Sequence, residues 1–132
     1  MIKILLSFIL LSVTLFADLR HEYPTKKILD SKIPIVDIRT SAEWVETGIV
    51  KDAITIMFFN ENGGYDVNDF LTELNKKVDT TKPFALICRT GSRTGMIADF
   101  LSKELKYNVI NLKGGMVYLK GTRLPVIVPY KK

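Results

Sequence analysis

One cysteine stands in a loop whose composition suits a reactive thiolate. Cys88 is the only cysteine among 132 residues, and it begins the sequence Cys-Arg-Thr-Gly-Ser-Arg at positions 88–93. The two arginines bring positive charge to this loop and favour the thiolate over the thiol. The glycine at position 91 suits a tight turn whose amide groups converge on one point. We therefore expect Cys88 to act as a nucleophile in a loop that attracts anions.

The segments on either side of this loop predict a strand before it and a helix after it. Residues 83–87 form an apolar run that begins with proline, which is typical of a buried strand. From residue 94 onward, apolar side chains recur at helical spacing. The positive end of the helix dipole would then lie at Cys88 and stabilise the thiolate further. The alternative is a structural cysteine that ends a strand, because free cysteine is among the most buried residue types.

Predicted strands alternate with predicted helices along the chain. This alternation indicates an α/β fold, with a parallel sheet of about five strands and helices on both faces. In such sheets ligands bind beyond the carboxyl ends of the strands, which is where Cys88 is expected. After a polar lead-in at residues 18–23, strands are predicted at 34–38, 53–58, 83–87 and 107–112, with an extended end at 125–128, and helices at 24–29, 41–47, 67–78, 94–106 and 116–120.

The N-terminal segment predicts export. A lysine in the first three residues precedes an almost wholly apolar run at 4–16, and Ala17 offers a cleavage point. An uncleaved membrane anchor is the competing interpretation, but the run is shorter than the roughly 20 residues that a spanning helix needs. We therefore expect a signal peptide at residues 1–17 and a single domain at 18–132. The expected location is periplasmic or secreted, with no stable membrane span in the mature form.

Charge and composition argue against several classes of function. The formal net charge is +5, and the lysines are scattered among acidic residues, so nucleic acid is not an expected partner, whereas small anions are slightly favoured. One cysteine and one histidine are too few for the usual metal sites, and no glycine-rich phosphate loop is present. We therefore expect neither a metal nor a cofactor. The lone histidine, His21, is far from the cysteine loop in sequence and is predicted to be a surface residue.

Three segments together resemble the rhodanese family of sulfurtransferases, over roughly residues 24–128. They are Val-Asp-Ile-Arg at 36–39 with Glu-Trp at 43–44 and a glycine at 48, the loop at 88–93, and Asn-Leu-Lys-Gly-Gly at 111–115 followed by a glycine at 121. The resemblance implies a rhodanese-like fold and a persulfide mechanism. Cys88 would attack the outer sulfur of a small anionic donor such as thiosulfate, hold that sulfur as a persulfide, and pass it to a thiol or cyanide acceptor.

The resemblance also implies roles within the loop. Cys88 would be the catalytic residue, and the loop amide groups would hold the transferred sulfur. Arg89 matches an arginine of thiosulfate-using members, whereas Thr90 stands where some of them have lysine. Arg93 could pair with an oxyanion of the donor, because its guanidinium offers several fixed hydrogen-bond donors. The expected substrate-binding residues are Arg89, Thr90, Gly91, Ser92 and Arg93.

Some positions leave alternatives open or depart from the family pattern. Asp37 and Arg39 could line the pocket, although an ion pair that stabilises the loop after the first predicted strand is the favoured interpretation. The glycine pair at 114–115 could let the backbone approach the cysteine closely, or could form a plain turn. Three departures are interpreted as structural: Ile49, Asp52 and Tyr118 stand where the family often has histidine, glycine and tryptophan.

Two other functions fit parts of the pattern. Phosphatases of a related fold also use a cysteine and an arginine in one loop, but their loop is one residue longer than the four residues between Cys88 and Arg93. The shorter loop suits a single sulfur atom better than a phosphate. The stronger alternative is a non-catalytic sulfur carrier or thiol redox sensor that serves one protein partner. An enzyme should turn over repeatedly with thiosulfate, whereas a dedicated carrier should react slowly with small thiols.

Overall fold

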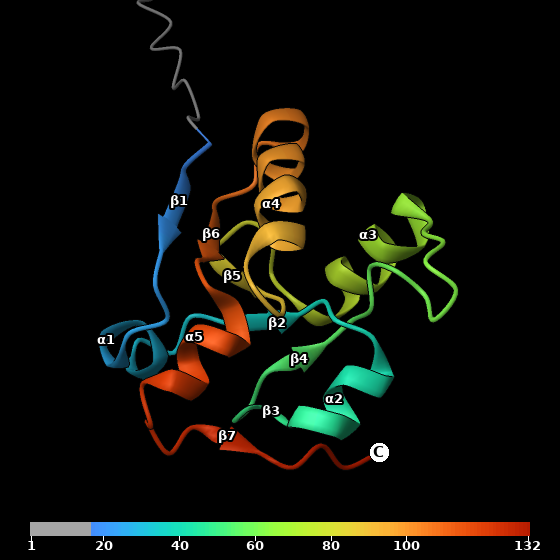
Figure 1. Cartoon of the computed structure of the whole chain (residues 1–132). Coiled ribbons are helices and arrows are strands. Elements are labelled where there is room, and N and C mark those ends of the chain that lie inside the picture. Colours follow the sequence, from blue (N-terminus) through green and yellow to red (C-terminus); the bar gives the residue numbers. More distant parts are fainter. Residues whose placement is uncertain (1–16) are drawn as a thin grey trace, which may run out of the picture.

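A parallel sheet forms the centre of the fold. The computed structural model describes residues 17–132, so the signal peptide predicted at 1–17 lies almost wholly outside the described residues. Within them, five parallel strands hydrogen-bond in the order β1-β6-β5-β2-β4 (Figure 1), which confirms the predicted fold class. These strands are β1 (Leu19–Glu22), β2 (Ile35–Asp37), β4 (Ile54–Thr55), β5 (Phe84–Ile87) and β6 (Val109–Leu112).

Helices cover both faces of this sheet. Side chains of α3 and α4 pack on one face, and those of α1 and α5 pack on the other, each with its own apolar cluster. Across residues 17–132, no helix is long and apolar enough to cross a bilayer. The helices are α1 (Lys26–Asp30), α2 (Ser41–Thr47), α3 (Val67–Lys77), α4 (Ser92–Leu105) and α5 (Gly115–Gly121).

Strand β5 lies in the middle of the sheet and is buried along its whole length. Its side chains alternate between the two layers, because successive residues of a strand point to opposite faces. Leu86 and Cys88 join the cluster beneath α3 and α4, whereas Ala85 and Ile87 join the cluster beneath α1 and α5. Burial on both faces explains the continuous apolar run from which this strand was predicted.

The helix ends near the sheet follow the capping signals in the sequence. At α2 the Thr40 hydroxyl accepts a hydrogen bond from the Glu43 amide, and the Glu43 carboxylate accepts one from the Thr40 amide. This capping box fixes where α2 begins, and Gly48 ends the helix with a φ of 75°. Asp66 caps α3 by accepting from the Asp69 amide at 3.0 Å.

The edges of the sheet differ from the sequence prediction. The expected polar lead-in contains β1, which pairs with β6 in parallel. An edge strand has a single neighbour and keeps polar side chains, so β1 lacks the apolar run by which a central strand is found. The extended C-terminal segment is confirmed, but β7 (Ile127–Val128) pairs antiparallel with β3 (Ile49–Val50) outside the main sheet.

The first turn of α5 is docked on the end of β5. The amides of Met116 and Val117 donate to the carbonyl oxygens of Cys88 and Arg89 at 2.9 and 3.0 Å. Gly115 has a φ of 56°, and a Cβ atom at this position would lie 2.4 Å from the carbonyl oxygen of Cys88. Only glycine permits this approach, so the close-contact interpretation of the glycine pair at 114–115 is confirmed.

Replacing Gly115 with alanine should therefore separate α5 from the cysteine loop. We expect Gly115→Ala to lower the free energy of unfolding, measured by urea titration, by about 2–4 kcal/mol. Gly121→Ala is the matched control, because a Cβ atom there has no neighbour within 4 Å. It lies at the end of the same helix and should leave stability unchanged or raise it by up to about 1 kcal/mol. Equal losses in the two variants would contradict the close-contact interpretation.

Candidate active site

The candidate site lies where two neighbouring strands end and their connections diverge. From β2 the chain passes through α2 toward β4, whereas from β5 it passes through α4 to β6 on the other side. A parallel sheet has its crevice at such a switch point, outside the carboxyl ends of the strands. Arg39 follows β2 and Cys88 follows β5, so the topology brings the first and second sequence motifs together.

The loop at 88–93 directs one backbone donor at the cysteine sulfur and leaves several others without an acceptor. Gly91 has a φ of 93° and ends the turn before α4, and its amide donates to Sγ of Cys88 at 3.1 Å. Among residues 17–132, the amides of Arg89, Thr90, Ser92 and Arg93 have no hydrogen-bond acceptor. The first amide groups of α4 therefore remain available, at the positive end of the helix dipole. This arrangement suits an anion at the sulfur or immediately above it.

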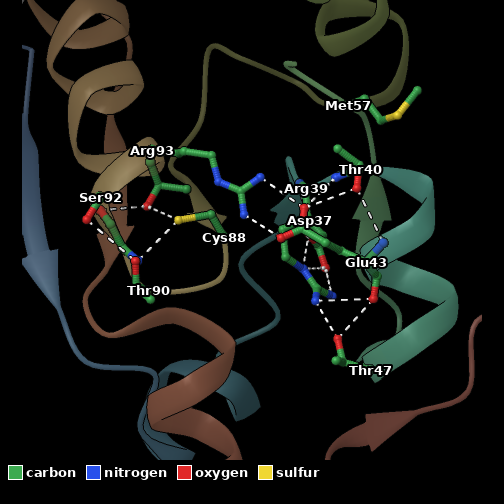
Figure 2. Close-up of polar contacts among 12 residues, drawn as sticks. Asp37, Arg39, Thr40, Glu43, Thr47, Met57, Cys88, Thr90, Ser92 and Arg93 are labelled. Atoms are coloured by element: carbon green, nitrogen blue, oxygen red, sulfur yellow. Dashed lines mark hydrogen bonds and ion pairs between the residues drawn. The ribbon is translucent and has the colours of Figure 1, made fainter. Parts of the chain in front are cut away.

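Cys88 itself has no exposed surface. Full burial agrees with the structural alternative, but the polar contacts of the sulfur do not, because a core cysteine needs no directed amide donor. Besides the Gly91 amide, the Thr94 hydroxyl lies 3.5 Å from Sγ, and either group can be the donor. The sulfur lies beside Thr90 and Ser92 (Figure 2), which are exposed although the sulfur itself is buried.

A second glycine contact holds the loop against the start of α5. A Cβ atom at Gly91 would lie 3.0 Å from the amide nitrogen of Gly114. The two turns therefore touch through their backbones at Gly91 and Gly115, whereas a Cβ atom at Gly114 would lie 2.5 Å from Cβ of Tyr118. This explains why glycine stands in both the cysteine motif and the third sequence motif.

Behind the sulfur lies a line of polar side chains that sequence analysis missed. The Thr94 hydroxyl donates to Oδ1 of Asn111 at 2.6 Å, and Nδ2 of Asn111 donates to Nδ1 of His21 at 3.0 Å. His21 is exposed, as predicted, but it is not remote from the motifs. Sequence analysis missed this line because it did not predict β1. The register of β1 with β6 places His21 beside Asn111.

Arg93 forms a two-pronged ion pair with Glu43. Its two terminal nitrogens lie 3.0 and 2.7 Å from the carboxylate oxygens, and the pair joins α4 to α2 (Figure 2). Burial acts to raise the pKa of Glu43, but hydrogen bonds from Arg93 and Thr40 and the charge of Arg93 outweigh it and lower this pKa to about 2. The hydrogen bond to Glu43 likewise raises the pKa of Arg93. Contact between Arg93 and a donor oxyanion stays a prediction.

Arg39 and Asp37 form a buried ion pair, as sequence analysis favoured. Their side chains are 2% and 0% exposed, and an Arg39 nitrogen lies 2.8 Å from the Asp37 carboxylate. Arg39 also donates to the Thr47 hydroxyl at 2.6 Å and to the carbonyl oxygen of Gly48 at 2.7 Å. Because every terminal nitrogen has an acceptor, the pair attaches the end of α2 to the end of β2.

A cavity of about 340 Å³ lies beside the cysteine loop. Arg89 is the one predicted substrate-binding residue that lines it, together with the buried guanidinium of Arg39. Arg89 is exposed and, within residues 17–132, has no acidic partner. The remaining lining residues are Glu43, Glu46, Thr47, Met116, Val117, Lys120 and Ile127.

The sequence matches the rhodanese-like domain family over residues 19–121. The chain belongs to the rhodanese-like family. The match spans the sheet, the cysteine loop and α5, which are the parts that build the site. Family membership and a sulfurtransferase among the relatives support sulfur transfer in general.

Individual relatives of this rhodanese-like chain are distant. An uncharacterized protein of Rickettsia prowazekii is 32% identical over 92 residues, which is 67% of this chain and 72% of that protein. A sulfurtransferase of Allochromatium vinosum is 25% identical over 113 residues, or 85% of this chain and 95% of that protein. A crystal structure of an M. tuberculosis protein has a TM-score of 0.59 at 23% identity, over 72% of this chain and 77% of the other, and shows the fold alone.

One departure from the rhodanese family pattern has a direct structural explanation. Asp52 has a φ of 65°, in the left-handed region where glycine is unstrained. The glycine common at this position in the family therefore suits the same turn, and aspartate is among the side chains that tolerate it. Ile49 contributes to β3, and Tyr118 packs against Tyr23 with ring centroids 4.6 Å apart.

The Glu43–Arg93 pair should make stability depend on pH in the acidic range. Because the pKa of Glu43 falls from 4.5 to about 2 on folding, its contribution is complete above the higher value and lost as pH falls toward the lower one. Glu43→Gln keeps a capping side chain but removes the charge. We expect it to cost about 1–2 kcal/mol near neutral pH, after allowance for solvent screening.

Urea unfolding of both proteins across the acidic range measures this effect. The difference between wild type and Glu43→Gln should shrink steadily as pH is lowered from about 5 to about 2. Glu46→Gln is the matched control, since Glu46 lies on the same helix but is exposed and, among the described residues, unpaired. A difference that stayed constant with pH, or that Glu46→Gln reproduced, would contradict the assigned ion pair.

Proposed function

We propose that this rhodanese-like protein is an enzyme that transfers sulfane sulfur through a Cys88 persulfide. The observation that supports this most strongly is the Gly91 amide aimed at Sγ of Cys88 at 3.1 Å. It belongs to a loop whose other amide groups have no acceptor among residues 17–132. A persulfide carries a negative charge on its outer sulfur, and unused amide donors in the same loop are available to stabilise that charge.

The proposed reaction has two displacement steps. In the first, the Cys88 thiolate attacks the outer sulfur of thiosulfate, a sulfur–sulfur bond forms to Cys88, and the sulfur–sulfur bond of the donor breaks. Sulfite leaves with the bonding electron pair. In the second, an acceptor thiolate or cyanide attacks the outer sulfur of the persulfide. The product is an acceptor persulfide or thiocyanate, and Cys88 returns as the thiolate, so no external oxidant or reductant is needed.

The charges around the loop support a small anionic donor. Arg93 is held by Glu43, whereas Arg89 is exposed at the cavity and free of acidic partners within the described residues. Arg89 is therefore the arginine that we propose meets the donor, and Lys120 adds positive charge to the same cavity. Because Cys88 has no exposed surface, the loop must open before any donor can reach the sulfur.

The burial of Cys88 also favours a second candidate function. A carrier that is loaded and unloaded by one protein partner needs no permanently open channel from solvent to the sulfur. A fully buried sulfur is compatible with that role. The two functions differ in turnover. An enzyme releases many equivalents of sulfite from thiosulfate when a small thiol is present, whereas a carrier accepts sulfur once and discharges it slowly to such thiols.

Persulfide formation is tested by the intact mass of the full chain after incubation with thiosulfate, or with a low-molecular-weight persulfide. We expect wild type to gain one sulfur atom and lose it when a thiol acceptor is added. Cys88→Ser should fold but gain nothing, because a hydroxyl does not ionise near neutral pH. No adduct from either donor would overturn the proposal, and an adduct without repeated turnover would favour the carrier.

We also propose that the protein acts outside the cytosol after loss of residues 1–17. Every described strand and helix lies downstream of that point, and Asp18 already bonds to the sheet through its amide and carbonyl groups. Cleavage before Asp18 would leave these bonds intact. Mass analysis of the protein recovered from an exported fraction should give Asp18 as the first residue, and a product that retains Met1 would contradict this.

A further inference from the structure

The Asn111 amide sets the direction of the two hydrogen bonds that join Thr94 to His21. Nδ2 of Asn111 can only donate, and it lies 3.0 Å from Nδ1 of His21. Nδ1 is therefore the acceptor, which requires a neutral imidazole. Oδ1 of Asn111 can only accept, so it receives the Thr94 hydroxyl proton at 2.6 Å. In this state the Thr94 proton points away from the sulfur. The Gly91 amide is then the donor that reaches Sγ.

Strand register puts these side chains on one face of the sheet. His21 pairs with Asn111 across β1 and β6, and Leu86 pairs with Asn111 across β5 and β6. Cys88 follows Leu86 by two residues and therefore points to the same face. Asn111 is 4% exposed in a strand that is otherwise apolar, with Gly95 of α4 directly above its amide nitrogen. A buried amide at this point is held by its two polar neighbours.

We propose that Asn111 and His21 are positioning residues that decide whether the Thr94 hydroxyl donates to the Cys88 sulfur. A protonated His21 would place an N–H group against the Asn111 amide nitrogen, and two donors cannot face each other. The Asn111 amide must then turn over, so that Oδ1 accepts from His21 and Nδ2 donates to Thr94. Thr94 now accepts from Asn111, and its own hydroxyl hydrogen becomes free to donate to another acceptor.

The Thr94 hydroxyl then has two other acceptors within hydrogen-bonding distance. They are the carbonyl oxygen of Gly91 at 3.2 Å and Sγ of Cys88 at 3.5 Å. A negatively charged sulfur is the stronger acceptor of the two, because hydrogen bonds to charged groups are about twice as strong as neutral ones. Protonation of His21 therefore stabilises the thiolate, or the persulfide anion, through a hydrogen bond from Thr94 to the sulfur. This hydrogen bond is absent when His21 is neutral.

The charged neighbours of His21 come from several elements. On β1, Arg20 and Glu22 flank His21 but point to the opposite face, and they pair with each other. Lys113 follows β6 and Lys27 belongs to α1, and both line the cleft beside His21. On α4, which also packs on β1, Asp99 pairs with Lys103. None of these groups lies between His21 and Asn111, and the Asn111 amide is the group that links the imidazole to Thr94.

This inference rests on the proposed function, in which the ionised Cys88 sulfur carries out the transfer. The effect of His21 on the ionisation of Cys88 can nevertheless be tested without a sulfur donor. Cys88 is the only cysteine of the chain, so ultraviolet thiolate absorbance, corrected with the matching Cys88→Ser protein, reports its ionisation alone. The full-length protein is titrated between about pH 5 and 8, where histidine changes charge. The variants compared are His21→Gln, Asn111→Leu and Thr94→Val, with Thr94→Ser to restore the hydroxyl.

We expect the wild-type thiolate titration to be broader than that of a single group, because two coupled groups titrate together. Near pH 6 its thiolate fraction should exceed that of His21→Gln by about three- to tenfold, with the difference vanishing toward the basic end of the range. His21→Gln should restore a single-group curve. In the Asn111→Leu background, His21→Gln should not change the titration curve further. Thr94→Ser should keep the shape of the wild-type titration curve, whereas Thr94→Val should lose it.

Arg20→Gln is the matched control, because it removes a positive charge from the same strand without touching Asn111. It should leave the shape of the titration unchanged. The inference is overturned if the His21→Gln curve superimposes on that of wild type, or if His21→Gln acts equally in the Asn111→Leu background. The second result would assign the effect to direct electrostatics. Because His21 is exposed, its variant tests the inference even if Asn111→Leu fails to fold.

Discussion

The contact between two glycine turns, at Gly91 and at Gly114–Gly115, is the constraint on which the rest of the site depends. Backbone meets backbone there without an intervening side chain, so the carbonyl groups at the end of β5 are taken by α5. On the other side of the same loop, the Gly91 amide points at the sulfur, and the amides of Arg89, Thr90, Ser92 and Arg93 have no acceptor among residues 17–132. A turn with any Cβ atom at this contact would have to open, and the amide groups would no longer converge.

Charge in the site is distributed so that the helix and backbone dipoles act on the cysteine more directly than the arginines do. Glu43 neutralises Arg93, and Asp37 neutralises Arg39, in both cases with the carboxylate fixed by helix or strand geometry. These pairs hold α2 against the ends of β2 and α4. The positive potential that remains at the loop comes from unused amide groups, the first turn of α4, and the exposed Arg89.

Much of this arrangement could be predicted from the sequence because it depends on local signals. Cys88 at a strand-to-helix turn, the Thr40–Glu43 capping box and the glycine-rich third motif are each visible within a few residues. The partner of Arg93 was not predictable, because Glu43 lies 50 residues away in the sequence. Strand β1 was missed because three of its four residues, Arg20 to Glu22, are polar, so it looks like a loop. The neighbours of His21 were missed with it. Distant pairing through the sheet, rather than any local pattern, carries that information.

The position of β1 also has a consequence for how the chain folds. Its only strand partner in the main sheet is β6, and their paired residues are separated by 90 positions, as in Leu19 and Val109. During synthesis from the N-terminus, β1 therefore has no partner until nearly all of the described chain is available. Contacts of such large sequence separation are entropically expensive and slow folding. The first strand among the described residues is thus added late to the sheet.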